Sequence, residues 1–138
     1  MMVNPKTAPV VWILLASDDI DRRNACKAIL ERAGFGIEPA GHGRVTIEKA
    51  KHRHYDLLLL DMAFDVSDGL RAVAAIREME WQRGQVETPM LAIIGASSNG
   101  AEEYCRSLGI NRILHSPVAT AVLVKLIEGL VSMRAPTP

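Results

Sequence analysis

Short apolar runs alternate with amphipathic stretches along the whole chain. The apolar runs, each of strand length, lie at 10–16, 35–40, 55–61, 89–94 and 112–114. Apolar residues recur at helical spacing in the stretches that follow, at 22–32, 45–52, 70–79, 101–108 and 119–133. Strands that alternate with helices in this way are typical of βαβ units, with a parallel sheet and helices on both of its faces.

The third apolar run indicates where its strand lies in the sheet. It contains four consecutive leucines, Leu57 to Leu60, with no alternation of apolar and polar residues. Both faces of such a strand are buried, which is typical of the centre of a parallel sheet. Pro39 in the second run indicates an edge strand, because proline cannot donate a ladder hydrogen bond. We therefore expect a doubly wound α/β domain with five helices and five parallel strands in the order 2-1-3-4-5.

Composition and charge narrow the functional classes. The 138 residues fit one domain, and 16 basic against 16 acidic residues give a formal net charge of zero. We therefore expect no contact with nucleic acid or membranes, and no apolar run approaches the ~20 residues that span a bilayer. Two cysteines, Cys26 and Cys105, form no metal-binding spacing and favour a reducing, cytoplasmic setting. We expect the domain to span 10–133, with 1–9 disordered or foreign to it and 134–138 a C-terminal tail.

Acidic residues follow two strands that should be neighbours in this sheet. Asp61 ends the leucine-rich run, and Asp18 and Asp19 follow the first run. Carboxylates that converge repel one another unless a cation joins them, and Mg²⁺ takes one or two carboxylates together with waters. A carboxylate can also attack phosphorus and form an acyl phosphate. The alternative for a single residue is a helix cap, which Asp19 or Asp21 would form at the start of the first helix.

The segment around Asp61 resembles the receiver domains of two-component signalling. It reads Tyr-Asp-Leu-Leu-Leu-Leu-Asp over 55–61, and an Asp68-Gly69 pair follows at the distance usual for that family. Glu-Arg-Ala-Gly at 31–34 and the small residue Ala40 before a turn also fit. The resemblance covers 10–133 and implies a flavodoxin-like, CheY-like fold.

The resemblance also implies a function and a set of site residues. Asp61 would accept a phosphoryl group from a phosphohistidine on a histidine kinase or phosphotransfer protein. Weakly bound Mg²⁺ would be held by Asp18, Asp61 and the Ala63 carbonyl, with Asp19 as a further candidate ligand. The surface of the fourth helix, fifth strand and fifth helix would carry the signal and could form a homodimer. The polar loop expected at 80–88 resembles receivers attached to hybrid sensor kinases.

Several positions depart from the family pattern. The first of two acidic residues is replaced by a serine, unless a one-residue shift restores the pair. A hydroxyl after the fourth strand, an aromatic residue in the fifth and a lysine before Pro117 are also missing, although Pro117 itself remains a candidate cis-proline. The degenerate positions are Ser17, Ile94, Gly95, Ile113 and Ser116.

These departures leave two hypotheses open. The chain is either an atypical receiver phosphorylated on Asp61, or a degenerate pseudo-receiver that binds protein partners without phosphorylation. His115 could replace the missing lysine if protonated, although a structural strand-end histidine is the commoner case. The rings of His52 and His54 diverge on a helix, so we expect no metal pair there. A free-standing enzyme is disfavoured, because the sequence shows no second nucleophile or base.

Overall fold

The computed structural model describes residues 10–62, 66–95 and 100–134, and within these ranges five strands alternate with five helices. The elements are β1 (Trp12–Ser17), α1 (Ile20–Arg32), β2 (Gly36–Ala40), α2 (Gly43–His52), β3 (Leu57–Met62), α3 (Val66–Arg83), β4 (Met90–Ile94), α4 (Ala101–Ser107), β5 (Arg112–His115) and α5 (Thr120–Arg134). The strands pair in parallel in the order β2-β1-β3-β4-β5. The predicted doubly wound fold and strand order are confirmed.

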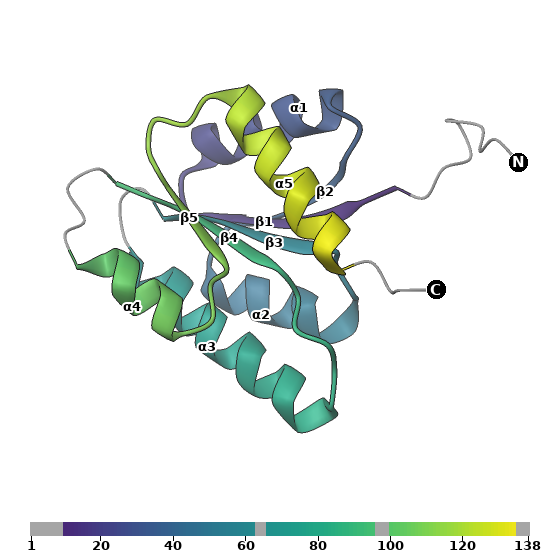
Figure 1. The fold of residues 1–138 in the computed structure, drawn as a ribbon, viewed down its shortest axis with the longest axis vertical. Coiled ribbons are helices and arrows are strands. Elements are labelled where there is room, and N and C mark those ends of the chain that lie inside the picture. Colours follow the sequence, from purple (N-terminus) through teal and green to yellow (C-terminus); the bar gives the residue numbers. More distant parts are fainter. Residues whose placement is uncertain (1–9, 63–65, 96–99, 135–138) are drawn as a thin grey trace, which may run out of the picture.

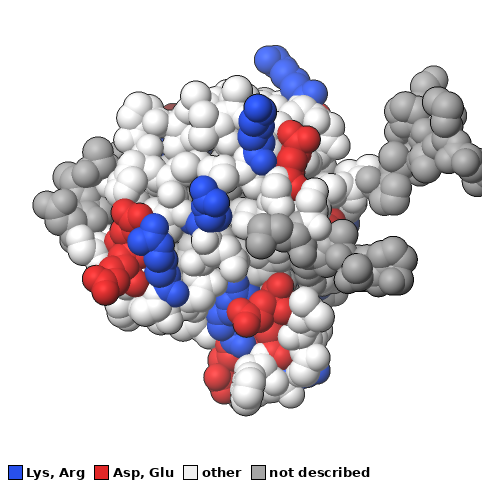
Figure 2. Space-filling view, viewed as in Figure 1, with Lys and Arg blue, Asp and Glu red and all other residues white. Residues whose placement is uncertain are grey.

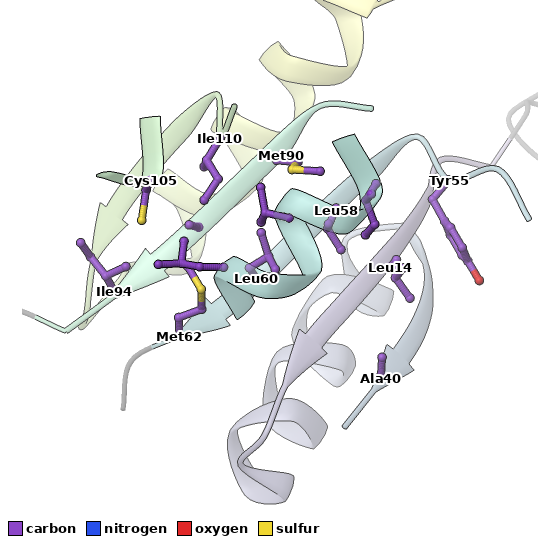
Figure 3. Close-up of a cluster of buried hydrophobic side chains, with 14 residues drawn as sticks. Leu14, Ala40, Tyr55, Leu58, Leu60, Met62, Met90, Ile94, Cys105 and Ile110 are labelled. Carbon is purple, nitrogen blue, oxygen red and sulfur yellow. The ribbon is translucent and has the colours of Figure 1, made fainter. Parts of the chain in front are cut away.

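Helices cover both faces of this sheet (Figure 1), with α1 and α5 on one face and α2, α3 and α4 on the other. The side chains of β3 alternate between the two layers. Leu57 and Leu59 belong to the buried cluster that includes residues of α1 and α5. Leu58 and Leu60 belong to the other cluster, which is drawn in Figure 3. Each of the four leucines is at most 2% exposed, so β3 is held from both sides and its ends are fixed in space.

The first two strands form one side of the sheet, with β2 at its edge and β1 next to it. β2 forms one edge, and Pro39 lies in it opposite Leu15 of β1, as the missing donor predicts. β1 begins two residues later than expected and continues through Ser17. Its first residue is tied to the segment before β3, because the Trp12 N–H donates to the Asp56 carboxylate at 2.8 Å.

Helix α3 is longer than the sequence predicts. Residues 80–83, assigned to a polar loop by their composition, form its last turn. Glu80 is only 3% exposed, and its carboxylate accepts hydrogen bonds from Arg77 at 2.8 Å and from the Thr88 backbone N–H at 2.7 Å. Because this buried carboxylate joins the helix to the segment before β4, the helix continues through a stretch with loop-like composition. The greater length of α3 does not make it a membrane span, because none of the described helices is long and apolar enough to cross a membrane.

Candidate functional site

Asp61 lies near the carboxyl end of β3, on the face of the sheet that α1 covers. Its side chain shares that face with Leu57 and Leu59, because successive strand residues point to opposite sides. Ser17 is its register partner on β1 and donates from Oγ to Asp61 Oδ2 at 3.3 Å. Both side chains are buried, with Ser17 3% and Asp61 7% exposed. A hydroxyl, and not a second carboxylate, therefore faces Asp61 across the two strands.

Arg22 of α1 binds the Asp61 carboxylate through both oxygens. Its Nε donates to Oδ2 at 2.8 Å and its second guanidinium nitrogen donates to Oδ1 at 2.9 Å. This fork-to-fork geometry is the strongest form of an arginine–carboxylate contact. The Asp61 side chain is 5% exposed and that of Arg22 is 35% exposed, so the pair is half shielded from water. The hydrogen bond to Asp61 is the main cause that raises the pKa of Arg22 above its usual value.

The two aspartates after β1 lie in different environments. Asp19 is the N-cap of α1, and its Oδ1 accepts from the Arg22 backbone N–H at 3.0 Å. Asp18 is exposed and lines, together with Ser17 and Asp61, a pocket of about 20 Å³. The helix-cap alternative therefore holds for Asp19, and the unshifted register places Ser17 at the strand end. The structure brings Asp18 and Asp61 to the same pocket.

The Asp68-Gly69 pair has a structural role beside this pocket. Asp68 accepts from the backbone N–H of Gly43, the first residue of α2, at 2.7 Å. A Cβ added at Gly69 would collide with the buried side chain of Met62. The pair therefore joins the starts of α2 and α3 and permits their close approach to the end of β3.

Within the described residues, the degenerate positions other than Ser17 bring no hydroxyl or cation to Asp61. The side chain of Ile94 is fully buried in the cluster on the opposite face of the sheet, and Gly95 has none. Ile113 packs against that same cluster. Ser116 follows β5, donates from its backbone N–H to the Ile94 carbonyl at 2.8 Å, and precedes Pro117 through a cis peptide bond. The Ala63 carbonyl lies outside the described residues.

His115 contacts α4, and the described contacts of Asp61 come from Arg22 and Ser17 instead. The His115 Nε2 lies 3.1 Å from a carboxylate oxygen of Glu102, which also accepts from Arg106 at 2.6 Å. The hydrogen bond with His115, and then that with Arg106, lowers the pKa of Glu102. Figure 2 shows acidic and basic side chains mixed on this side of the molecule, which agrees with a net charge of zero.

The described residues do not fit a divalent cation in this arrangement. Both oxygens of Asp61 accept hydrogen bonds from a guanidinium, which already neutralises the carboxylate. In the part of the chain that the structure describes, no three His, Cys, Asp or Glu residues gather as a metal-binding group.

The fold and the site define a CheY-like α/β domain with an aspartate near the carboxyl end of its central strand. The chain belongs to the response regulator receiver domain family, whose sequence profile matches residues 13–128. Among solved structures, the receiver domain of the sensor histidine kinase PA1611 from Pseudomonas aeruginosa PAO1 superposes with a TM-score of 0.78 and 26% identity. The match covers 90% of this chain and 99% of that one, which holds a magnesium ion in its active-site cleft. The chemotaxis protein CheY4 of Vibrio cholerae gives a TM-score of 0.77 at 24% identity, covering 88% and 99% of the two chains.

Histidine kinases are among the curated relatives of the chain. Hybrid signal transduction histidine kinase K of Dictyostelium discoideum is 31% identical over 125 residues, which is 86% of this chain and 10% of that kinase. Kinase M of the same organism is 27% identical over 121 residues, covering 86% of this chain and 5% of the kinase. BarA of Shigella flexneri is 29% identical over 116 residues, covering 84% and 12%. The chain thus spans a small part of the length of these relatives.

Arg22 is the site residue that the sequence analysis missed. A signal for it exists, because Arg22 and Arg23 lie in the first turn of α1. The positive end of the helix dipole disfavours cations there by about 0.3–1 kcal/mol each. Two arginines at this position therefore need acceptors from outside the helix. Arg22 donates to the Asp61 carboxylate, and Arg23 donates to the Ser17 carbonyl at 2.9 Å.

We predict that Arg22 and Asp61 make coupled contributions to the free energy of unfolding. Arg22→Ala should lower the free energy of unfolding by about 1–3 kcal/mol, because it leaves a buried carboxylate without its cation. In an Asp61→Ala background the same change should cost much less, which urea unfolding of the four proteins in a double-mutant cycle would measure. Lys27→Ala, which breaks an exposed pair with Glu31 on the same helix, is the matched control and should change stability by about 0.5 kcal/mol or less. Equal costs of Arg22→Ala in both backgrounds would contradict the coupling.

We also predict that the Cys26 thiol is protected in the folded protein. Burial raises the pKa of Cys26 to about 11, and the negative charge of Asp61 adds to this shift. At mildly alkaline pH the folded protein should therefore hold roughly a hundredfold less thiolate at Cys26 than the urea-unfolded chain. Alkylation by iodoacetamide, followed by peptide mass mapping, would measure the rate. Between pH 9 and pH 10 the folded-state rate should still rise roughly tenfold, and a rate that levels off over this interval, as in the unfolded chain, would refute the shift.

Proposed function

We propose that this receiver domain acts as a phosphorylation-independent protein-interaction module within a two-component system. Its partner would be a histidine kinase or phosphotransfer protein, and the similarity to receivers of hybrid kinases supports a place in such a kinase. The observation that carries the proposal is the bidentate contact of Arg22 with Asp61. In this state the carboxylate is held and neutralised by a side chain of its own domain.

The contact opposes the chemistry of a phosphoacceptor. Nucleophilic attack on phosphorus uses a lone pair on one carboxylate oxygen. Charge-assisted hydrogen bonds from a guanidinium draw electron density from both oxygens of Asp61 and so lower their nucleophilicity. Releasing Arg22 from a half-shielded pair would cost roughly 1–3 kcal/mol. Replacing the usual lysine by Ser116 forfeits a charge-assisted hydrogen bond of about 1.5–3 kcal/mol. If the two effects add, phosphorylation slows by roughly two to four orders of magnitude.

The surface of α4, β5 and α5 is the docking face that we propose for the partner. β5 is the edge strand of the sheet, and the helices on its two sides each carry an exposed apolar side chain. Tyr104 of α4 is 56% exposed and Val122 of α5 is 48% exposed. Apolar side chains of this kind, among mixed charges, are the anchors expected of a protein interface. A second copy of the domain could use the same face to form a homodimer.

A second candidate function is supported by the position of Asp61. It lies near the carboxyl end of the central strand, and Asp18 lines the same pocket. This is the arrangement that the resemblance assigns to a phosphoacceptor with Mg²⁺ on Asp18 and Asp61. It would require Arg22 to leave the carboxylate before the metal and the phosphoryl donor arrive.

Intact mass spectrometry separates the two candidates. The domain would be incubated with acetyl phosphate and millimolar Mg²⁺, beside Asp61→Asn and Arg22→Ala. We expect no phosphoryl adduct on the wild-type protein under conditions that modify a phosphorylatable receiver domain run in parallel as a positive control. A metal-dependent adduct on the wild type that is absent from Asp61→Asn would overturn the proposal in favour of the second candidate.

The docking claim has its own readout, for which Tyr104→Ser is added to the same set of proteins. Affinity for the phosphotransfer domain of a histidine kinase, measured by calorimetry, should be the same for wild type and Asp61→Asn. Tyr104→Ser should weaken it severalfold, because it removes an exposed anchor without touching the core. An affinity that depends on Asp61 or ignores Tyr104 would contradict this part of the proposal.

A further inference from the structure

A second and much larger pocket lies at the opposite end of the sheet from Asp61. It has a volume of about 460 Å³, against about 20 Å³ for the pocket beside Asp61. Its wall is built from the last turns of α2 and α3 and from the segments that enter β3 and β4. Pockets that bind small molecules typically measure about 300–1,000 Å³, so this one has the size of a ligand site.

The floor of this pocket is apolar. Leu14 and Leu58 are register partners on β1 and β3, and Ile76 approaches them from α3. All three are at most 3% exposed within the fold. Tyr55 adds an aromatic edge and is labelled, like Leu14 and Leu58, in Figure 3. Such a floor would seat a flat or branched hydrocarbon group.

The rim of the pocket is cationic. Lys51, Arg53 and Arg83 all line it. Arg83 donates to the Lys51 carbonyl at 3.1 Å, which joins the last turns of α2 and α3. The Arg53 guanidinium lies 4.3 Å from the ring centroid of Trp12, and this contact orients it. Its N–H donors lie in the plane of the guanidinium, so the contact with the ring does not use them.

The positive charge of the rim exceeds the partial negative charge at the C-termini of α2 and α3. The C-termini of α2 and α3 supply about −0.5 charge each, so the three cations leave a surplus of about +2. Glu80 is the acidic residue in the wall, and it is already bound by Arg77 and by the Thr88 N–H. The exposed Glu48 lies 3.7 Å from Lys51, and counting its full charge still leaves a surplus of about +1.

We propose that this pocket binds a small anionic amphiphile. The ligand would have an apolar body of aromatic or short aliphatic character and one carboxylate, sulfonate or phosphate group. The body would rest on Leu14, Leu58 and Ile76, and the anionic group would accept hydrogen bonds from the cations of the rim. Because the pocket and Asp61 lie at opposite ends of the sheet, binding should not depend on the state of the site at Asp61.

Anilinonaphthalene sulfonate is a suitable probe, because it combines an aromatic body with one negative charge. Its fluorescence should show saturable binding to one site on the folded protein at neutral pH. N-phenylnaphthylamine, which has the aromatic frame without the sulfonate, should bind roughly tenfold more weakly. Decanoate should compete with the probe. Methyl NMR signals of Leu14, Leu58 and Ile76 should shift during the titration.

Three variants test the assignment to this pocket. Lys51→Gln combined with Arg83→Gln should raise Kd of the sulfonate roughly tenfold and leave the neutral analogue unchanged. Ala50→Leu should abolish binding of both probes, because it fills the pocket from α2. Arg106→Gln, an exposed cation on α4, is the matched control and should change neither. Urea midpoints and near-ultraviolet circular dichroism would establish that each variant is folded.

The outcomes separate this inference from the proposed function. Binding that Asp61→Asn leaves intact supports the pocket whether or not the domain is phosphorylated. Absence of saturable binding, methyl shifts confined to other parts of the fold, or equal affinity for charged and neutral probes would overturn it. Binding that survives Ala50→Leu would also overturn it, because the probe would then lie elsewhere.

Discussion

Burial of β3 from both sides is the constraint on which the rest of this domain depends. Leu57 and Leu59 face α1 and α5, while Leu58 and Leu60 face the helices of the other layer. A strand held in this way cannot slip, since a one-residue shift would exchange both sets of side chains. The end of the strand therefore presents Asp61 toward α1, and its start forms part of the larger pocket.

The ion pair between Arg22 and Asp61 is the feature of the site that sets this receiver apart. The family fold delivers a carboxylate to the usual place, but the chain supplies a guanidinium where other members can bind a metal ion, as the PA1611 receiver does. Ser17, in place of an acidic residue, lowers the negative charge that would otherwise attract a cation. Together these features favour a fixed surface over a phosphorylation switch.

The sequence predicts the fold well because its strongest signals are local. Leu57 to Leu60 indicate a central strand, and Pro39 indicates an edge; both are confirmed. The candidate site is only partly predictable, because its contacts join residues distant in the sequence. No spacing rule connects Arg22 to Asp61, and composition alone cannot show that Glu80 is buried through an arginine and a backbone N–H. The larger pocket likewise arises from two helix ends that only the fold brings together.

The most direct test of the central claim is the NMR signal of the Arg22 Nε–H group during a Mg²⁺ titration. This proton is donated to Asp61 Oδ2 at 2.8 Å, so its signal should be slow to exchange and should move in Asp61→Asn, which also assigns it. We expect that millimolar Mg²⁺ leaves the position and the exchange rate of this signal unchanged. A saturable shift with faster exchange would show that the metal displaces Arg22 and would contradict the account.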